Sequence, residues 1–215
     1  MRSAGNDIVS LSSVNSQRTL QPNYYTRVLS ASEKKRYDSI RFNIPFDEFI
    51  WMSWAVKEAA YKFLKRNHSA LEFSPTRLEV VQCHEPDNGV MPEADCRVFS
   101  NKDQPSYSGT VTCGELGILY FRAVRTRDWI AAVVNGVNEF SRIVWHVDEI
   151  ENESRATQSA RVRELLLRAL GERYPGMLTI EKTAGDYPVL HQNSHPVDLP
   201  ISFAHHGRYV SFVVM

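Results

Sequence analysis

Residues 45–66 are the segment that most constrains how this chain can fold. Pro45 suits the first turn of a helix, and the pattern predicts a helix that runs to about Arg66. At about 100° per residue, apolar and aromatic side chains cover nearly the whole circumference of this helix. A helix that is apolar on all sides is buried. The rest of the chain must therefore provide the surfaces that cover it.

Charged residues interrupt this apolar surface on one side. Glu58, Lys62 and Lys65 fall within one arc of roughly 60°, whereas Lys57 points towards another side. Glu58 and Lys62 are neighbours at i, i+4, so the simplest interpretation is a helical salt bridge on the exposed side of a buried helix. The alternative is a site where Glu58 binds a cation and the lysines bind anions, as in a magnesium–phosphate complex. Spacing alone favours the salt bridge.

Short runs rich in β-branched and aromatic residues predict antiparallel strands in the rest of the chain. A short helix is predicted at 30–40, capped by Ser30 or Ser32, and a long amphipathic helix at 153–176. Turn residues at 85–95 predict a loop. The predicted strands are 6–11, 77–83, 96–100, 107–113, 117–124, 128–135, 141–150, 177–183 and 186–192, followed by a hairpin at 201–215 that turns at "HHG" or "HGR".

The order of these elements repeats along the chain. Each half runs strand, helix, strand and closing hairpin, and "TRLEVV" in the first half parallels "MLTIEK" in the second. We therefore predict an α+β fold of two pseudo-related halves, each an antiparallel sheet packed on a long helix. The halves would span residues 1–140 and 141–215, with a cleft between them.

Composition narrows the class of protein. The chain has 25 Lys+Arg and 25 Asp+Glu, so its bulk charge favours neither a nucleic acid nor an anionic membrane as partner. No apolar run is long enough to span a bilayer. The N-terminal residues lack the apolar core of a signal peptide, and we interpret them as the first strand of the fold. Cys83, Cys96 and Cys113 lie far apart, which argues against a disulfide framework or a zinc site. The expected compartment is the reducing cytoplasm.

Three motifs together resemble one known family. "WAVKEAAYK" at 54–62 resembles the W/F-x-x-K-E-A-x-x-K signature of the 4′-phosphopantetheinyl transferases. "GNDIV" at 5–9 resembles that family's G-I/V-D motif, and "ISFAHHG" at 201–207 resembles its I-S-x-S-H-D-G hairpin. Two further segments resemble family motifs more loosely, namely 25–37 (the R-v-l-s-x-x-E segment of the holo-acyl-carrier-protein synthase type) and 184–190 (the G-K-P motif).

The order of the motifs implies a particular architecture. Small synthases of this family have G-x-D, K-E-A and S-H in that order and trimerise, whereas longer, two-halved members begin with S-H. This chain has the length of the longer kind and the motif order of the small kind. The resemblance therefore implies a pseudo-dimer within one chain, expected to be a monomer. The first half would supply Asp7, Lys57, Glu58 and Lys62, and the second half Ser202 and His205 across the cleft.

The resemblance implies transfer of 4′-phosphopantetheine from coenzyme A to a serine of an apo acyl or peptidyl carrier protein, releasing 3′,5′-ADP. Asp7 and Glu58 match the family's metal ligands and would hold Mg²⁺ on the diphosphate of coenzyme A. Either Glu58 or a metal-bound water would take the serine proton. Without the resemblance, Asp7 would be interpreted as a turn residue near a chain end.

The other matched residues are expected to bind coenzyme A. Lys62 matches the last lysine of the K-E-A motif and would contact the phosphates as a catalytic residue. Lys57 is a second candidate or simply a surface lysine. His205 and Ser202 match the S-x-S-H hairpin and would bind a phosphate of coenzyme A. His206 is interpreted as part of a polar turn, and no partner ligands for a zinc ion accompany the two histidines.

Departures from the family pattern leave alternatives open. Asn6 replaces an aliphatic residue, Ala204 replaces the second serine of the hairpin motif, and His206 replaces its acid. No lysine stands in the G-K-P position, where Asp186 and Tyr187 precede the proline. One alternative is a catalytically impaired relative that only binds carrier or synthase domains. Another is a transferase that uses a different nucleotide-like donor.

The expected carrier-protein contact is a basic patch. The carrier's acidic helix meets a basic and apolar surface in this family. Four basic residues form either such a patch or an ordinary solvated helix face, namely Arg27, Lys34, Lys35 and Arg36. The pathway that the carrier serves, whether fatty acid, polyketide or peptide synthesis, stays open.

Overall fold

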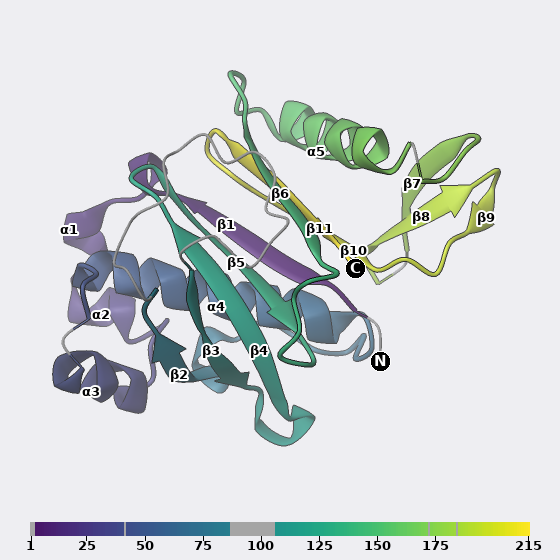
Figure 1. Ribbon diagram of the computed structural model, residues 1–215. Helices are drawn as coiled ribbons and strands as arrows, with labels where there is room; N and C mark the ends of the chain where they lie inside the picture. The colour runs from purple at the N-terminus through teal and green to yellow at the C-terminus, as the bar shows by residue number, and fades with distance from the viewer. Residues whose placement is uncertain (1–2, 41, 87–105, 172, 184) are drawn as a thin grey trace.

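The computed structural model describes residues 3–40, 42–86, 106–171, 173–183 and 185–215 (Figure 1). The predicted strand 96–100 and most of the predicted loop 85–95 lie outside these residues. The elements are β1 (Gly5–Ser10), α1 (Ser16–Thr19), α2 (Pro22–Tyr25), α3 (Ala31–Ser39), α4 (Phe46–Lys65), β2 (Glu79–His84), β3 (Tyr107–Thr112), β4 (Ile118–Arg125), β5 (Trp129–Asn135), β6 (Val144–Glu149), α5 (Arg155–Leu170), β7 (Leu178–Lys182), β8 (Pro188–Gln192), β9 (His195–Pro196), β10 (Ile201–His206) and β11 (Tyr209–Val214).

A five-stranded antiparallel sheet carries helix α4 on one face (Figure 1). Its strand order is β1-β5-β4-β3-β2, so the first strand pairs with the last strand of this segment. Side chains alternate between the two faces of each strand. Val9 of β1 and Ile130 of β5 pack in the core beneath α4, whereas Ile8 and Ala131 pack in the core on the opposite face. Both faces of this sheet are therefore buried around β1 and β5.

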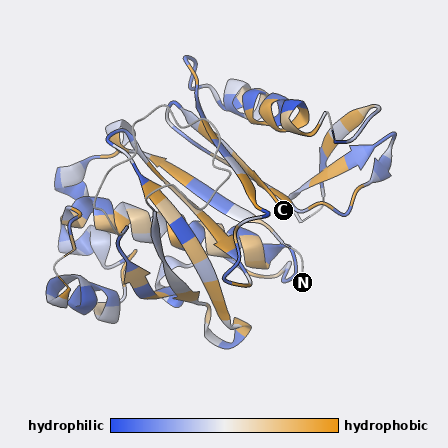
Figure 2. Ribbon diagram, in the orientation of Figure 1, coloured by the Kyte–Doolittle hydropathy of each residue, from blue (hydrophilic) through white to orange (hydrophobic). Residues whose placement is uncertain are grey.

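A second antiparallel sheet, in the order β10-β11-β6, covers the face that α4 leaves open. β1 lies against β10 and β11, and the core between the sheets includes Trp129, Trp145 and Val213. Helix α5 packs on the far side of the second sheet, against Val210 and Phe212 of β11. Figure 2 shows hydrophobic residues running along these strands. The described layers therefore follow the order α4, five-stranded sheet, three-stranded sheet, α5.

The predicted elements agree with the structure in most places. The long helix predicted at 45–66 is α4, and Ser30 caps α3 in a capping box with Glu33. The closing hairpin turns at Gly207-Arg208, within "HGR". Helix α5 ends at Leu170, earlier than predicted, because Gly171 follows it as the C-cap.

The second half differs from the prediction of a single sheet on a long helix. Strands β7, β8 and β9 form a separate three-stranded sheet and do not extend β10-β11-β6. β6 does pair with the last strand, β11, as β1 pairs with β5. The division at residue 140 and the relation between the two halves stay predictions. Among the described helices, none is both long and apolar enough to cross a membrane.

A buried polar contact joins the two main sheets. Asn6 of β1 is fully buried and donates from Nδ2 to Ser211 Oγ at 2.9 Å. The same oxygen accepts a hydrogen bond from Trp145 Nε1 at 3.0 Å. The Nδ2 group of Asn6, which departs from the family's aliphatic residue, is therefore paired with a hydroxyl from the opposite sheet, whereas its Oδ1 is buried without a hydrogen-bond partner among the described residues. Buried amide groups are tolerated when they find such partners.

Replacing Ser211 should test this contact. Ser211→Ala removes the oxygen that accepts both hydrogen bonds, so we expect the free energy of unfolding to fall by roughly 1–3 kcal/mol. Urea denaturation measures the change. The exposed Ser69 is the matched control, and Ser69→Ala should change stability by less than about 0.5 kcal/mol. Equal small effects for both variants would show that the contact contributes nothing.

Candidate active site

The site depends on how closely helix α4 approaches strand β1. A Cβ atom placed at Gly5 would lie 2.0 Å from the backbone oxygen of Ala59 and 2.8 Å from the backbone nitrogen of Phe63. No other residue type fits there without displacing the backbone. Because side chains alternate along β1, Asp7 projects on the same face as Gly5, towards α4. The glycine therefore brings the carboxylate of Asp7 to the charged side of the helix.

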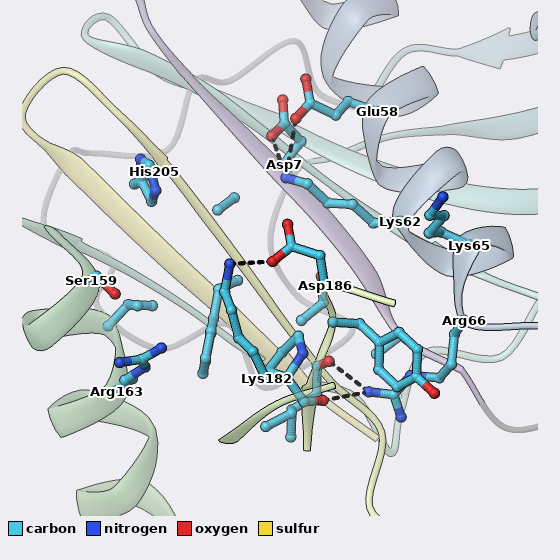
Figure 3. A pocket seen from close by; sticks show the side chains of 18 of the residues that line it. Asp7, Glu58, Lys62, Lys65, Arg66, Ser159, Arg163, Lys182, Asp186 and His205 are labelled. Atoms are coloured by element: carbon cyan, nitrogen blue, oxygen red, sulfur yellow. Dashed lines mark hydrogen bonds and ion pairs between the residues drawn. The ribbon is translucent and has the colours of Figure 1, made fainter. Parts of the chain in front are cut away.

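Asp7, Glu58 and Lys62 form one charged cluster (Figure 3). Lys62 Nζ lies 2.8 Å from Asp7 Oδ1 and 3.4 Å from Glu58 Oε1. Nζ also donates to the backbone oxygen of Asn6 at 3.1 Å. The structure thus brings together three of the site residues predicted from the motifs, and the i, i+4 pair is part of a larger cluster rather than an isolated surface salt bridge.

Burial and neighbouring charges shift the pKa values of Asp7 and Lys62. Burial, aided by the nearby negative charge of Glu58, raises the pKa of Asp7 to about 7, although Lys62 opposes the shift. Burial lowers the pKa of Lys62, but Asp7 and Glu58 outweigh this effect and raise it overall. Lys62 is therefore a stable ammonium group, and Asp7 changes charge near neutral pH.

The cluster opens into a cleft of about 700 Å³. Its walls come from β1 and α4 on one side and from α5, β10 and the 185–188 loop on the other (Figure 3). Three carboxylates line it, those of Asp7, Glu58 and Asp186. Six cationic side chains outnumber them, namely Lys62, Lys65, Arg66, Arg155, Arg163 and Lys182. A cleft with this excess of positive charge favours a ligand with several negative charges.

Strand β10 contributes the two residues predicted from the second half. Ser202 is 5% exposed and His205 is exposed, and both line the cleft. Burial, together with Lys62 and Arg155, lowers the pKa of His205. Its imidazole is therefore neutral at neutral pH and can donate one N–H to an anion. Residues far apart in the sequence thus line the same cleft.

His206 has a different environment from His205. Its Nδ1 accepts a hydrogen bond from the backbone N–H of Ser10 at 2.9 Å, and it does not line the cleft. This bond attaches the hairpin to the end of β1. Burial lowers the pKa of His206, which keeps Nδ1 available as an acceptor. Its role in the structure is to hold two strands together.

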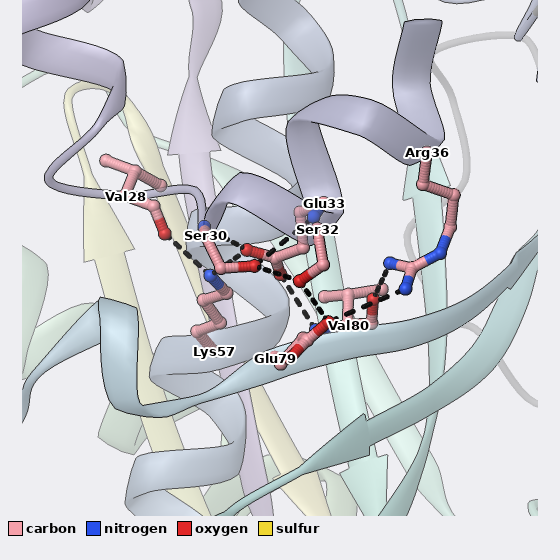
Figure 4. Close-up of polar contacts among 8 residues, drawn as sticks. All are labelled: Val28, Ser30, Ser32, Glu33, Arg36, Lys57, Glu79 and Val80. Carbon is pink, nitrogen blue, oxygen red and sulfur yellow. Dashed lines mark hydrogen bonds and ion pairs between the residues drawn. The ribbon is translucent and has the colours of Figure 1, made fainter. Parts of the chain in front are cut away.

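The position of Lys57 contradicts the expectation that it contacts coenzyme A. It is fully buried and does not line the cleft, because it lies about 100° around the helix from Glu58. Its Nζ donates to Glu33 Oε2 at 2.7 Å and to the backbone oxygen of Val28 at 2.6 Å (Figure 4). Glu33 also accepts from the backbone N–H of Val80. This ion pair fastens α3, α4 and β2 together, so we withdraw Lys57 as a coenzyme A contact.

Removing one member of this buried pair should be costly. Lys57→Met leaves the Glu33 carboxylate buried and unpaired, so we expect a loss of about 3–5 kcal/mol in the free energy of unfolding. The double variant Lys57→Met/Glu33→Gln should recover part of that loss in chemical denaturation. Lys34→Met, which breaks an exposed ion pair with Asp38, is the control and should cost less than about 1 kcal/mol. A single variant no less stable than the double variant would contradict the pairing.

Helix α5 contributes cleft residues that the motifs do not contain. Arg155, Ser159 and Arg163 stand at i, i+4 and i+8, on one side of the helix, and all three line the cleft. This spacing is visible in the sequence. The sequence does not say, however, that this side faces a cleft, because an arginine stripe on an amphipathic helix is usually an exposed face.

Arg66 fixes the loop that corresponds to the loose G-K-P match. Its Nη2 donates to the backbone oxygens of Pro188 and Ile201, at 2.9 Å and 3.1 Å. Its guanidinium lies 5.0 Å from the ring centroid of Tyr187. Lys182 pairs with Asp186 at 2.7 Å beside this loop. A lysine from β7 therefore lies next to the position where the family motif has its own lysine.

Asp7 and Glu58 fit a magnesium ion better than a zinc or calcium ion. The described ranges contain no group of three or more His, Cys, Asp or Glu side chains placed to hold a metal. Structural zinc and all-protein calcium sites need such a group. Mg²⁺ is bound by one or two carboxylates and completes its shell with water and substrate phosphate oxygens. Two carboxylates beside a cationic cleft meet that requirement.

Comparison with known proteins identifies the family. The family model described as the 4′-phosphopantetheinyl transferase superfamily matches residues 3–134, more than half of the chain. The chain belongs to this superfamily, which supports phosphopantetheine transfer in general and implies coenzyme A and a carrier protein as partners. No curated protein matches the chain, and no solved structure does. The matched region includes Asp7, Glu58 and Lys62 and ends before Ser202 and His205.

Proposed function

We propose that this protein transfers the 4′-phosphopantetheine group from coenzyme A to a serine of an apo acyl or peptidyl carrier protein, as a holo-acyl-carrier-protein synthase does. The reaction would depend on Mg²⁺ and release 3′,5′-ADP. The observation that carries the proposal is the Asp7–Lys62–Glu58 cluster at one wall of a cation-rich cleft. Membership of the superfamily supports the type of group transferred.

The side chains of Asp7 and Glu58 differ in exposure, and this difference supports a separate role for each carboxylate. The side chain of Asp7 is 7% exposed and that of Glu58 is 28% exposed. Both would hold Mg²⁺, which supplies a positive charge that polarises the diphosphate and stabilises the leaving phosphate. Glu58, the more accessible carboxylate, is better placed to accept the proton of an incoming serine hydroxyl.

Lys62 would bind the donor's diphosphate. Its raised pKa keeps it charged, and Asp7 and the Asn6 carbonyl hold Nζ at the edge of the cleft. An ammonium group in a partly buried position stabilises negative charge that develops on phosphate oxygens during transfer. His205 and Ser202, on the opposite wall, would donate hydrogen bonds to a phosphate of the same donor.

The single chain would supply both walls of its own site. Asp7, Glu58 and Lys62 come from the first half, and Ser202 and His205 come from the second. Each half pairs its first strand with its last, β1 with β5 and β6 with β11. These similarities support a pseudo-dimer that works as a monomer, in which no second copy is needed to complete the cleft.

Glu58→Gln tests the proposed catalytic role. The change removes the negative charge and the proton acceptor, so we expect transfer to fall by roughly 10²-fold or more. Purified protein would be incubated with coenzyme A, Mg²⁺ and apo carrier proteins from several pathways, and mass spectrometry would detect the added phosphopantetheine. Thermal denaturation would check that the variant is folded.

One control variant and two outcomes make this experiment decisive. Glu115→Gln changes a carboxylate that does not line the cleft and should leave transfer unchanged. Retained activity in Glu58→Gln would remove Glu58 from the mechanism. If the unaltered protein binds carriers but modifies none of them, it is a binding module and the proposed reaction is wrong.

Metal affinity should depend on pH through Asp7. A protonated carboxyl does not bind Mg²⁺, and the pKa of Asp7 is about 7. Apparent affinity should therefore rise by up to about tenfold per pH unit well below pH 7 and level off above it. Calorimetric titration with Mg²⁺ or Mn²⁺ would measure this. Asp7→Asn should bind the metal weakly with little pH dependence, and a flat profile for the unaltered protein would contradict the assignment.

A further inference from the structure

Arg66 lies where three parts of the cleft wall meet. It directly follows α4, the helix that carries most of the charged cluster, and is the C-cap of that helix. Its Nη2 donates to the backbone oxygens of Pro188 and Ile201 (Figure 3). Pro188 belongs to the 185–188 loop, and Ile201 directly precedes Ser202 on β10. One guanidinium group therefore connects α4, the loop and β10.

The oxygen of Ile201 points to the free edge of its sheet. β10 is an edge strand, and on its β11 side the oxygen of Pro200 accepts from the N–H of Met215. Successive residues of an antiparallel strand direct their N–H and C=O groups to alternate sides, so the oxygen of Ile201 points away from β11. A buried carbonyl without a partner is costly. Arg66 supplies the donor that the sheet does not.

The oxygen of Pro188 is in the same situation on β8. The N–H of Thr183 donates to the oxygen of Tyr187, so by alternation the oxygen of Pro188 points away from β7. On that other side, β9 pairs with β8 only at His191 and Gln192. Nη2 of Arg66 therefore joins the free edges of two separate sheets.

The 185–188 loop keeps its shape through bonds of its own. The N–H of Asp186 donates to the oxygen of Thr183 at 2.9 Å, and Lys182 pairs with Asp186 at 2.7 Å. Strands β7, β8 and β9 also form a sheet that is not continuous with the others. Arg66 therefore contributes to where this loop stands relative to α4 more than to how the loop folds.

The guanidinium group suits this task in a way that an ammonium group does not. It lies 5.0 Å from the ring centroid of Tyr187 while Nη2 donates to both oxygens. A planar guanidinium can stack on a ring and direct its N–H groups along a fixed fork, whereas a lysine is a flexible point charge. A lysine at this position would keep the charge and lose the geometry.

We infer that Arg66 is a positioning residue of the transfer reaction, which sets the distance between the charged cluster and the walls formed by β10 and the 185–188 loop. This inference rests on the proposed function, because that reaction needs the donor held from both sides while its phosphorus faces the carrier serine. A misplacement of about 1 Å in such a geometry can slow a reaction by about 10²-fold. Arg66 acts through the two backbone oxygens and needs no contact with the donor.

Arg66→Lys separates position from charge. We expect kcat to fall by about tenfold or more, because the walls lose their spacing. The KM for coenzyme A should change by less than about threefold, because the positive charge of the cleft is retained. Steady-state transfer to an apo carrier protein with Mg²⁺ measures both constants. Arg77→Lys, at an exposed arginine outside the cleft, is the matched control and should leave both unchanged.

A second variant and a second measurement cover the case in which Arg66→Lys folds poorly. Tyr187→Leu removes the ring and keeps both hydrogen bonds of Arg66, so kcat should fall by a smaller factor, about threefold. Amide hydrogen exchange would follow the walls directly. Arg66→Lys should lose protection in 189–192 and 202–205, with β4 unchanged.

The outcomes separate this inference from the proposed function. An unchanged kcat in folded Arg66→Lys and Tyr187→Leu, or a loss no larger than the unfolded fraction, overturns the positioning role. A raised KM for coenzyme A with unchanged kcat shows a direct contact with the donor and overturns it too, while transfer by the unaltered protein stands. No transfer by the unaltered protein overturns the proposed function, and the part of Arg66 in it. A lower kcat at constant KM, with faster exchange in both walls, supports the inference.

Discussion

The close packing of helix α4 on strand β1 at Gly5 is the constraint on which the rest of the site depends. A side chain at this position would collide with the helix backbone at Ala59. Because the two elements touch there, the carboxylate of Asp7 reaches Lys62, and Glu58 stands beside both. Such a cluster needs a rigid frame, since opposite charges held apart from water are costly unless their geometry is maintained.

The two lysines of the K-E-A motif, Lys57 and Lys62, lie on different sides of helix α4 and have different partners. Lys62 faces the cleft, where two carboxylates keep it charged. Lys57, on another side of the helix, is buried against Glu33. Burial lowers the pKa of Lys57, and Glu33 opposes this shift. One lysine therefore belongs to the proposed chemistry, while the other fixes the position of the helix that carries it.

The second sheet and α5 turn this charged cluster into a cleft. The core between the sheets brings β10 and β11 against β1, and the Asn6–Ser211 hydrogen bond joins β1 to β11. His206 adds a bond to the end of β1. With the sheets held in this way, His205 and the arginines of α5 lie across from Lys62, and the cleft gains the positive charge that a donor with several phosphates requires.

The sequence by itself determined most of the local elements and indicated candidate residues for the site. Apolar periodicity predicted α4, alternation predicted most strands, and three short motifs indicated Asp7, Glu58, Lys62, Ser202 and His205. Only the tertiary structure decided that Lys57 is buried, that β7, β8 and β9 form a separate sheet, and that Arg163 faces the cleft. Periodicity reports which side of an element is apolar, but a charged residue's role depends on its partner. Those partners come from distant segments, as Glu33 does for Lys57 and β1 does for the hairpin, and packing alone brings them together.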